Sequence, residues 1–256
     1  MKMLFYPQMP RSYSKITDVC NKLKIQMVDM PCNHDVSDIK IAIHWNYNTI
    51  CPADDLLKLI SKKLPFINAN LNNVSKSYVD QIFTKIFGYS SFIDPSQSHG
   101  YCVRKSELQA AHDFKIIRLP AKKEKGFVYQ KLIDSRSSLT HFEEMRVCIF
   151  KNTISCVFIK SKQISNPIKG FDLAWFYSHA NDFLSENEQF LILLFSKEFG
   201  LDYGELDILR NNSDGKIYIL DVNNMPANFL FRKLAADQID RAKSFYANSF
   251  SLNFIS

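Results

Sequence analysis

Two short apolar strands near the C-terminal end of the chain, joined by a polar turn, restrict its fold more than any other segment. The strands are expected at Leu206–Arg210 and Lys216–Val222, where apolar side chains dominate. Residues 211–215, with the sequence NNSDG, are typical turn formers. These segments therefore predict a β-hairpin.

The polar side chains of this hairpin are expected to converge. Side chains alternate between the two faces of a strand, so Asp221 and Asn223 should point to one face, together with Ile217 and Ile219. In a hairpin centred on the turn, Asp207 lies diagonally across from Asp221 on that face. Two carboxylates and one amide oxygen then meet. Such ligands suit Mg²⁺, which takes its remaining ligands from water and substrate phosphates.

A surface hairpin whose acids face water is the alternative interpretation of these residues. Against it, Asp221 and Asn223 follow an apolar strand, and an unpaired carboxylate on a buried face is costly. We therefore expect Asp207, Asp221 and Asn223 to bind a metal ion.

The N-terminal third alternates strands with helices, which indicates an α/β lobe. Strands are expected at residues 40–45 and 65–68, and a helix at residues 52–62 with proline in its first turn. A second helix should begin after the capping residue Ser75 and end at Gly88.

From about residue 100 the pattern changes to strands. Ser185 and Glu188 form a capping-box pattern that should open a helix closed by Gly200. The expected strands are residues 101–105, 127–133, 145–150 and 153–160, and a last helix is expected at residues 233–247.

The composition indicates a folded globular protein outside the membrane. Hydrophobic residues make up 46% of the chain and charged residues 23%, which is enough apolar material for a core. No apolar run approaches the roughly 18 residues of a membrane helix, and the first residues break off before a signal-peptide core would form.

Charge and cysteine content narrow the function further. The net charge is +6, but the basic residues are dispersed and lack interleaved aromatics, so no nucleic-acid partner is expected. The six cysteines form no C-x-x-C motif, which favours a reducing cytoplasm and argues against structural zinc.

The hairpin resembles the metal-binding strands of the ATP-grasp superfamily. The superfamily pattern is an apolar residue and Asp on one strand, then Glu-x-Asn and a following Pro on the next, as in Asp207 and the run from Asp221 to Pro226. The superfamily includes ribosomal-modification, glutathione-synthase-like and D-alanine–D-alanine ligase-like enzymes. The resemblance covers about residues 65–230 and implies an α/β fold in which two lobes enclose ATP.

The resemblance also implies a division of the chain. Residues 1–75 would form an N-terminal lobe that precedes the ATP-grasp unit. Residues 76–135 would form the small central lobe with the adenine hinge, and residues 136–256 the C-terminal lobe with the metal site.

Several basic residues match superfamily positions that contact phosphate. Lys76, near the start of a helix, and Lys105, at the end of a strand, resemble the two phosphate-binding lysines. Arg146 resembles the arginine that steadies the transferring phosphoryl group, and its guanidinium needs a planar anionic partner. Lys160 and Lys162 lie where superfamily members often place a further basic residue. A solvated surface lysine is the alternative for Lys76 and for Lys105.

The strand around Val128 resembles the superfamily hinge that lies along adenine. Backbone groups of Gln130, Lys131 and Leu132 would read the adenine edge, and Asp134 would bond the ribose hydroxyls. Taken alone, the segment predicts only a strand.

Two features depart from the superfamily pattern. Asp221 replaces the usual Glu and is one methylene shorter, which favours binding one metal ion over bridging two. The phosphate-covering loop, residues 106–113, contains no glycine, so His112 or Asp113 is a candidate to meet phosphate or substrate instead. A structural role for His112 is the alternative.

The resemblance implies an enzyme that uses ATP and Mg²⁺ to activate a carboxylate as an acyl phosphate and to couple it to an amine. A small-molecule kinase of the same superfamily and a non-catalytic nucleotide-binding protein are the alternatives. The expected partners are a carboxylate and an amine substrate, with no nucleic acid and no membrane. The acceptor is open between an amino acid, a peptide end and a sugar acid, and a homodimer is also open.

Overall fold

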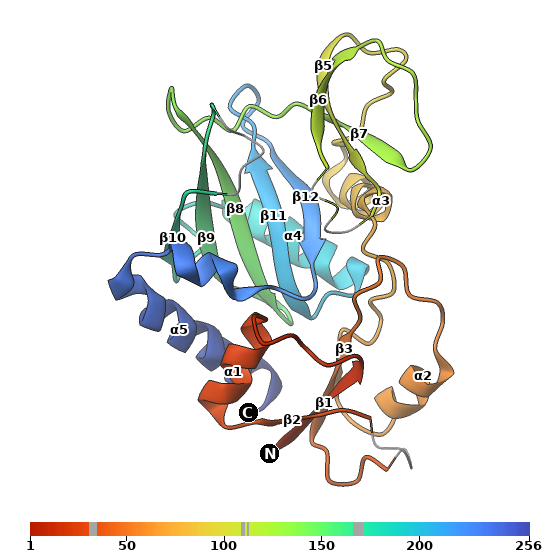
Figure 1. Ribbon diagram of the computed structural model, residues 1–256, viewed down its shortest axis with the longest axis vertical. Helices are drawn as coiled ribbons and strands as arrows, with labels where there is room; N and C mark the ends of the chain where they lie inside the picture. Colours follow the sequence, from red (N-terminus) through yellow and green to blue (C-terminus); the bar gives the residue numbers. More distant parts are fainter. Residues whose placement is uncertain (31–34, 109–110, 112, 166–170) are drawn as a thin grey trace.

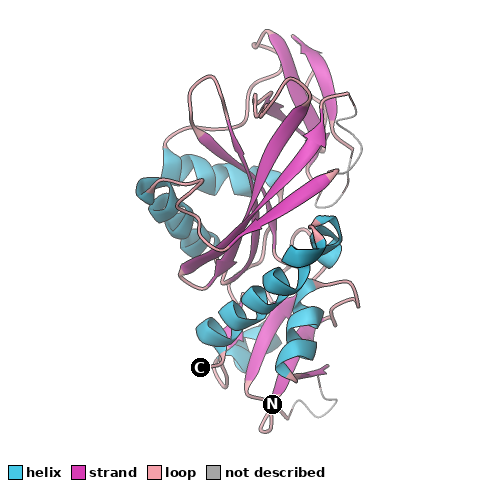
Figure 2. Cartoon of the chain, turned by 90° about the vertical axis from the view of Figure 1, so that its left-hand side faces the viewer, coloured by secondary structure: helices cyan, strands magenta, loops and turns pink. Residues whose placement is uncertain are grey.

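The structure is a computed structural model, and it describes residues 1–30, 35–108, 111, 113–165 and 171–256. Three sheets follow one another along the molecule (Figure 1). A parallel sheet lies at the end that carries both termini, a five-stranded antiparallel sheet lies in the middle, and a three-stranded antiparallel sheet lies at the far end (Figure 2). The predicted α/β class is confirmed.

The parallel sheet belongs to the N-terminal lobe and has the order β2-β1-β3-β4. Every residue of β3 is buried, as expected for a central strand of a parallel sheet. The elements are β1 (Lys2–Pro7), α1 (Lys15–Leu23), β2 (Gln26–Val28), β3 (Ile41–Trp45), α2 (Asp55–Ser61) and β4 (Phe66–Ile67).

Helix α2 begins later than the sequence suggested. The Asp54 side chain accepts hydrogen bonds from the N–H groups of Leu56 and Leu57, so Asp54 is the cap and lies outside the helix. The expectation that proline forms the first turn was therefore wrong.

The three-stranded sheet has the order β6-β5-β7, from β5 (Gly100–Ser106), β6 (Lys115–Leu119) and β7 (Phe127–Lys131). It follows α3 (Lys76–Phe87), where the predicted cap and end are confirmed. The Ser75 side chain accepts from the Tyr78 N–H, and Gly88 ends the helix in the left-handed conformation.

The five-stranded sheet has the order β10-β9-β8-β11-β12. Helices α3 and α4 cover one of its faces, which we call the apolar face, and Val147, Ile159, Ile208 and Ile219 pack there. The capping box of Ser185 and Glu188 at the start of α4 is confirmed. The elements are β8 (His141–Phe150), β9 (Thr153–Gln163), β10 (Leu173–Tyr177), α4 (Glu186–Phe199), β11 (Tyr203–Arg210) and β12 (Ile217–Asn223).

The opposite face of this sheet is covered only in part. Helix α5 (Ala236–Phe254) packs against α1, β8, β9 and β10, and the 3₁₀ helix η1 (Asn228–Lys233) packs beside β10. Phe150, Phe158 and Tyr203 are buried under these helices. The last helix begins later than expected because residues 228–233 form η1. The part of this face nearer the three-stranded sheet carries polar side chains, and there the candidate site lies.

No helix of the described chain is long and apolar enough to span a membrane.

Candidate functional site

A β-bulge in the C-terminal hairpin decides which side chains meet. Asp207 pairs directly with Asp221, whereas the next residue, Ile208, pairs with Ile219. The register therefore shifts by one residue at Leu220. A bulge of this kind reverses the alternation of side chains along the strand.

The bulge corrects two expectations. Asp221 lies directly opposite Asp207, not diagonally across from it. Ile217 and Ile219 pack on the apolar face, so they do not share a face with Asp221 as a regular alternation predicted. The convergence of the polar groups is nevertheless found, because the Asn223 amide donates to Asp207 Oδ2 at 3.1 Å.

Arg146 and Asp207 lie at the centre of the polar part of the sheet face opposite the apolar face, which we call the polar face. Arg146 Nε and Nη2 donate to Asp207 Oδ1 and Oδ2 at 2.7 and 2.8 Å, and Lys160 Nζ donates to Oδ1 at 2.9 Å. Burial raises the pKa of Asp207, but these two cations outweigh it and hold that pKa well below its usual range. Burial likewise lowers the pKa of Arg146, and the carboxylates of Asp207 and Glu205 more than reverse this. The predicted arginine is therefore largely shielded from solvent, with 16% of its side chain exposed, and it is fully charged.

Asp221 has a different environment from Asp207. No ion pair joins Asp221 to a lysine or arginine of the described residues, and its carboxylate accepts from the Val222 N–H at 3.1 Å. Burial raises the pKa of Asp221, although the ammonium groups of Lys105 and Lys76 act in the opposite direction. Asp221 is thus an incompletely neutralised carboxylate that faces two cations.

These groups fit a hard divalent cation in their chemistry. Asp207, Asp221 and Asn223 supply oxygen atoms on one face, and the Asp221 carboxylate carries charge that no neighbouring cation pairs. Within the described ranges, no group of three or more His, Cys, Asp or Glu side chains is arranged to hold a metal ion. A cation here would therefore need ligands from phosphate and water, and Arg146 would have to release part of Asp207.

Lys160 and Lys162 both pair with the carboxylate of Glu144. Both ion-pair with Glu144, which precedes Arg146 by two residues on β8, and the Lys162 Nζ to Oε2 distance is 3.2 Å. The Glu144 carboxylate raises the pKa of Lys162 above its usual value, although burial opposes this. Both predicted lysines thus lie at the site, but Glu144 holds them.

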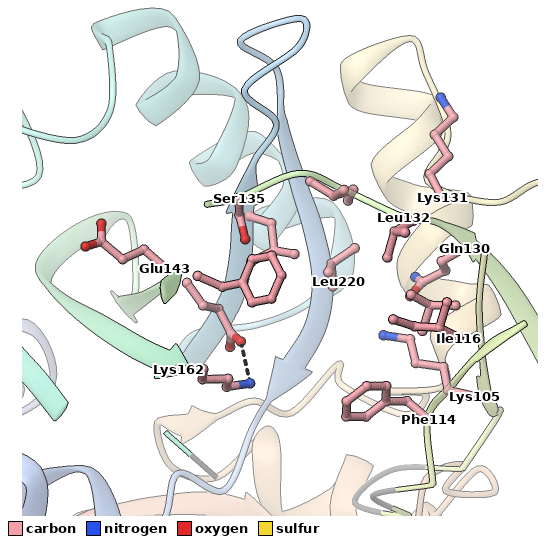
Figure 3. Close-up of a pocket in the computed structure, with 15 residues that line it drawn as sticks. Lys105, Phe114, Ile116, Gln130, Lys131, Leu132, Ser135, Glu143, Lys162 and Leu220 are labelled. Atoms are coloured by element: carbon pink, nitrogen blue, oxygen red, sulfur yellow. Dashed lines mark hydrogen bonds and ion pairs between the residues drawn. The ribbon is translucent and has the colours of Figure 1, made fainter. Parts of the chain in front are cut away.

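A pocket of about 170 Å³ adjoins this cluster between the five-stranded and three-stranded sheets. Figure 3 shows Lys105 and Lys162 reaching into it from opposite sides, while the ammonium of Lys131 points away. Its apolar lining comes mainly from Val103, Phe114, Ile116, Leu132, Ile133, Phe142, Leu209 and Leu220. The pocket has the apolar walls and few charged groups of a small-molecule site.

The hinge side chains are mostly engaged with the protein itself. Gln130 is 3% exposed and its amide donates to Ser91 Oγ at 3.1 Å, and the Lys131 N–H donates to the Ser91 carbonyl at 2.8 Å. The Asp134 carboxylate forms a two-point ion pair with Arg136, at 2.7 and 2.6 Å. The predicted contacts with adenine and ribose stay predictions. Of the three predicted hinge residues, Gln130 and Lys131 belong to β7, and Leu132 follows the end of that strand.

The loop after β5 is tied to the start of α3. Lys76 is buried and its Nζ donates to the Leu108 carbonyl at 2.7 Å, while Glu107 accepts from the N–H of Ser77 at 2.8 Å. The Asp113 carboxylate accepts from the N–H of Ser106, the last residue of β5, at 3.0 Å. His112 lies outside the described residues.

Lys105 completes the cationic side of the site. Burial lowers the pKa of Lys105 below its usual value, Asp221 opposes this, and the ammonium of Lys76 adds to it. Lys76 and Lys105 are therefore close enough to repel one another, and an anion between them would be favoured.

Two acids of the site were missed from the sequence. Glu144 lies two residues before Arg146 and Glu205 two residues before Asp207, so both belong to the polar face by alternation. The two-residue spacing from Arg146 and from Asp207 is the feature of the sequence that could have identified both acids.

Comparisons with known proteins address the fold. No family model and no curated protein matches the sequence. Among solved structures, a RimK domain ATP-grasp protein from Sphaerobacter thermophilus is 8% identical, with 100% of both chains covered and a TM-score of 0.56.

Two further structures are similar over nearly the whole chain. D-alanine–D-alanine ligase from Bacillus anthracis complexed with ATP is 14% identical, with 99% of this chain and 95% of that chain covered and a TM-score of 0.58. A RiPP-associated ATP-grasp ligase from Chryseobacterium gregarium, in complex with ADP and a leader and core peptide, is 13% identical, with 98% and 96% covered and a TM-score of 0.56. Together with the three sheets and the polar face described above, these likenesses show that the chain has the ATP-grasp fold.

Proposed function

We propose that this protein is an ATP-dependent ligase that activates a carboxylate as an acyl phosphate and couples it to an amine. One observation carries the proposal. An arginine, two lysines and two aspartates lie together on one face of the five-stranded sheet, and Lys105 of the three-stranded sheet reaches from the opposite side into the apolar pocket beside them.

In this proposal the nucleotide lies in the pocket between the two antiparallel sheets. Adenine packs among the apolar side chains, with the backbone around Leu132 along its edge, and Asp134 bonds the ribose once Arg136 moves aside. Lys76 and Lys105 neutralise the phosphates. The division into residues 1–75, 76–135 and 136–256 is part of this proposal, although α3 packs on α4 and β12.

The proposed first step is an in-line transfer of the γ-phosphoryl group. A substrate carboxylate oxygen forms a bond to the γ-phosphorus, the bond from phosphorus to the bridging oxygen breaks, and ADP leaves. Arg146 and Lys105 stabilise the charge on the transferring group. Asp207, Asp221 and Asn223 would hold Mg²⁺, which supplies further charge neutralisation at the phosphates.

The proposed second step is attack by the amine on the acyl phosphate. The amine nitrogen bonds to the carbonyl carbon, phosphate leaves, and the nitrogen loses one proton to give an amide. A peptide is within the proposed acceptor class, as are an amino acid and a sugar acid. The described cysteines are all free thiols, which agrees with a reducing compartment such as the cytoplasm.

An isotope experiment tests this function. The protein is given ATP, an amine and a carboxylate labelled with ¹⁸O, and the released phosphate is analysed by mass spectrometry. A ligase passes one labelled oxygen into phosphate. A small-molecule kinase would instead leave the phosphate on its product, and no ADP release from any carboxylate and amine pair would contradict both.

A non-catalytic nucleotide-binding protein is the second candidate, and one observation favours it. Asp207 already bonds to Arg146, Lys160 and Asn223, so its carboxylate is neutralised by the protein. Binding of ADP without any turnover of ATP in the assay above would support this candidate.

A further inference from the structure

A completely buried ion pair lies next to Arg146 of the candidate site. Lys15, in the first turn of α1, donates to Glu205 Oε1 on β11 at 2.5 Å, and both side chains are 0% exposed. The Lys15 ammonium also lies 4.3 Å from the centre of the Phe158 ring and 5.1 Å from that of Tyr246. Burying two charges is costly, so a pair at this position calls for a reason beyond stability.

The two oxygens of Glu205 are used unequally. Oε1 accepts from Lys15, from the Tyr246 hydroxyl at 3.2 Å and from Cys148 Sγ at 3.6 Å. Oε2 is buried and has no hydrogen-bond partner among the described residues. A buried carboxylate oxygen without a donor is unfavourable, and it is ready to accept one.

Arg146 is a cation close to this free oxygen. Its Nη1 lies 3.6 Å from Glu205 Oε2, which is beyond hydrogen-bond distance. Its other two nitrogens donate to Asp207. The guanidinium is therefore held between two carboxylates and is bonded to only one of them.

Under the proposed function, Arg146 and a divalent cation compete for the carboxylate oxygens of Asp207. A divalent cation at Asp207, Asp221 and Asn223 would withdraw oxygen lone pairs that Arg146 now uses. If Arg146 had no second acceptor, the cation would have to leave a partly buried guanidinium unpaired, and this cost would weaken cation binding.

We propose that Glu205 is a positioning residue that receives Arg146 when Asp207 takes up the divalent cation. In that state the Glu205 Oε2 atom accepts a hydrogen bond from Arg146 Nη1, and Lys15 holds the carboxylate in place through Oε1. A small movement of the guanidinium makes this bond, since the two atoms are already 3.6 Å apart. This inference rests on the proposed function and adds to it a second acceptor for the arginine.

The alternative is that Lys15 and Glu205 only fasten α1 to the sheet. The two roles predict different results for two variants. Lys15→Met leaves Glu205 without its lysine, so Glu205 should attract Arg146 and release Asp207, and divalent-cation binding should become tighter. The double variant K15M/E205Q replaces the charged second acceptor by a neutral amide at unchanged net charge, so Arg146 gains less from leaving Asp207 and cation binding should become weaker.

The test measures Mn²⁺ binding in the presence of ADP by isothermal titration calorimetry. We expect the K15M/E205Q protein to bind Mn²⁺ on the order of tenfold more weakly than the wild type, and K15M more tightly. The matched control is K85M/E198Q, which removes an exposed ion pair of the same charge on α3 and α4 and should leave the affinity unchanged.

The outcomes separate this inference from the proposed function. Failure of the wild-type protein to bind ADP and Mn²⁺ would overturn both. Binding by the wild type with equal affinity in K15M/E205Q, or weaker binding in both K15M and K15M/E205Q by the same factor, would overturn the inference alone.

A second measurement does not depend on the folding of any variant. In a crystal structure of the wild-type protein with ADP and Mn²⁺, Arg146 Nη1 should lie within hydrogen-bond distance of Glu205 Oε2. A structure with Mn²⁺ bound and the Glu205 Oε2 atom still lacking the Arg146 donor would overturn the proposal.

Discussion

The guanidinium of Arg146 donates two nearly parallel hydrogen bonds to the carboxylate of Asp207, at 2.7 and 2.8 Å. This two-point geometry is available to arginine and not to lysine, and it fixes the plane of the guanidinium as well as its charge. The pair joins β8 to β11, which lie side by side in the five-stranded sheet. It therefore orients the partly buried Arg146 within the candidate site.

Replacing Arg146 by lysine should impair the reaction more than it impairs folding. Lysine keeps the positive charge but loses the second hydrogen bond, so we expect phosphoryl transfer to fall about 10²-fold or more. Steady-state ADP release measures this. Arg241→Lys on α5, an exposed arginine, is the control and should retain the wild-type rate. Equal rates for all three proteins would remove Arg146 from the proposed mechanism.

Replacing Asp221 by alanine should abolish nucleotide turnover while the fold persists. The carboxylate pairs with no cation of the described chain, so its removal breaks no ion pair. ADP release and the thermal melting curve followed by circular dichroism together test this expectation. Asp237→Ala, in the first turn of α5, is the control for loss of an acid elsewhere. Turnover by D221A at the wild-type rate would show that the metal assignment is wrong.

The pKa of Asp221 predicts how stability depends on pH. Burial raises that pKa, so the folded state binds this proton more tightly than the unfolded state does. The contribution of Asp221 to stability is therefore largest at low pH and is lost as the pH rises through the raised folded-state pKa.

Asp221→Asn removes this titration. Without divalent cations, the free energy of unfolding of D221N relative to the wild type should increase as the pH rises above the ordinary aspartate range of about 4, and then level off. Urea unfolding at a series of pH values measures the difference. A difference that decreases with pH would mean that the environment of Asp221 favours its charged form.

Gly204 should tolerate no side chain, because β11 passes close to the end of β12. A Cβ atom there would lie 2.7 Å from Leu201 Cδ1 and 2.9 Å from the Asn223 carbonyl oxygen. We expect Gly204→Ala to destabilise the protein by about 1–3 kcal/mol. The resulting shift of Asn223 should also weaken Mn²⁺ binding in the presence of ADP.

Gly88→Ala is the comparison for this variant. Gly88 ends α3 at φ +78° and an added Cβ would meet nothing within 4 Å, so this change costs only the left-handed strain of about 1–2 kcal/mol. Chemical denaturation gives the stability of both variants, and calorimetry gives their Mn²⁺ affinity. Weaker Mn²⁺ binding in G88A than in G204A would contradict the predicted link between Gly204 and the site.

The sequence alone determined the features that depend on neighbouring residues. The cap at Ser75, the capping box at Ser185 and the helix ends at Gly88 and Gly200 are confirmed, because each is a contact or a backbone conformation within one turn. The ATP-grasp pattern around Asp207 and Asp221 also led to the observed fold. Strands β1, β2, β6 and β10 were not anticipated.

The tertiary structure decided which side chains meet and which are already engaged. Because of the bulge at Leu220, the Ile219 side chain points to the apolar face. A prediction that assumes strict alternation of side chains cannot anticipate such a bulge. The bonds from Arg146 to Asp207 and from Lys15 to Glu205 join segments far apart in the chain. Their existence depends on strand register and helix packing, so residue types and spacing identified the charged groups of the site while only the folded chain determined how those charges are paired.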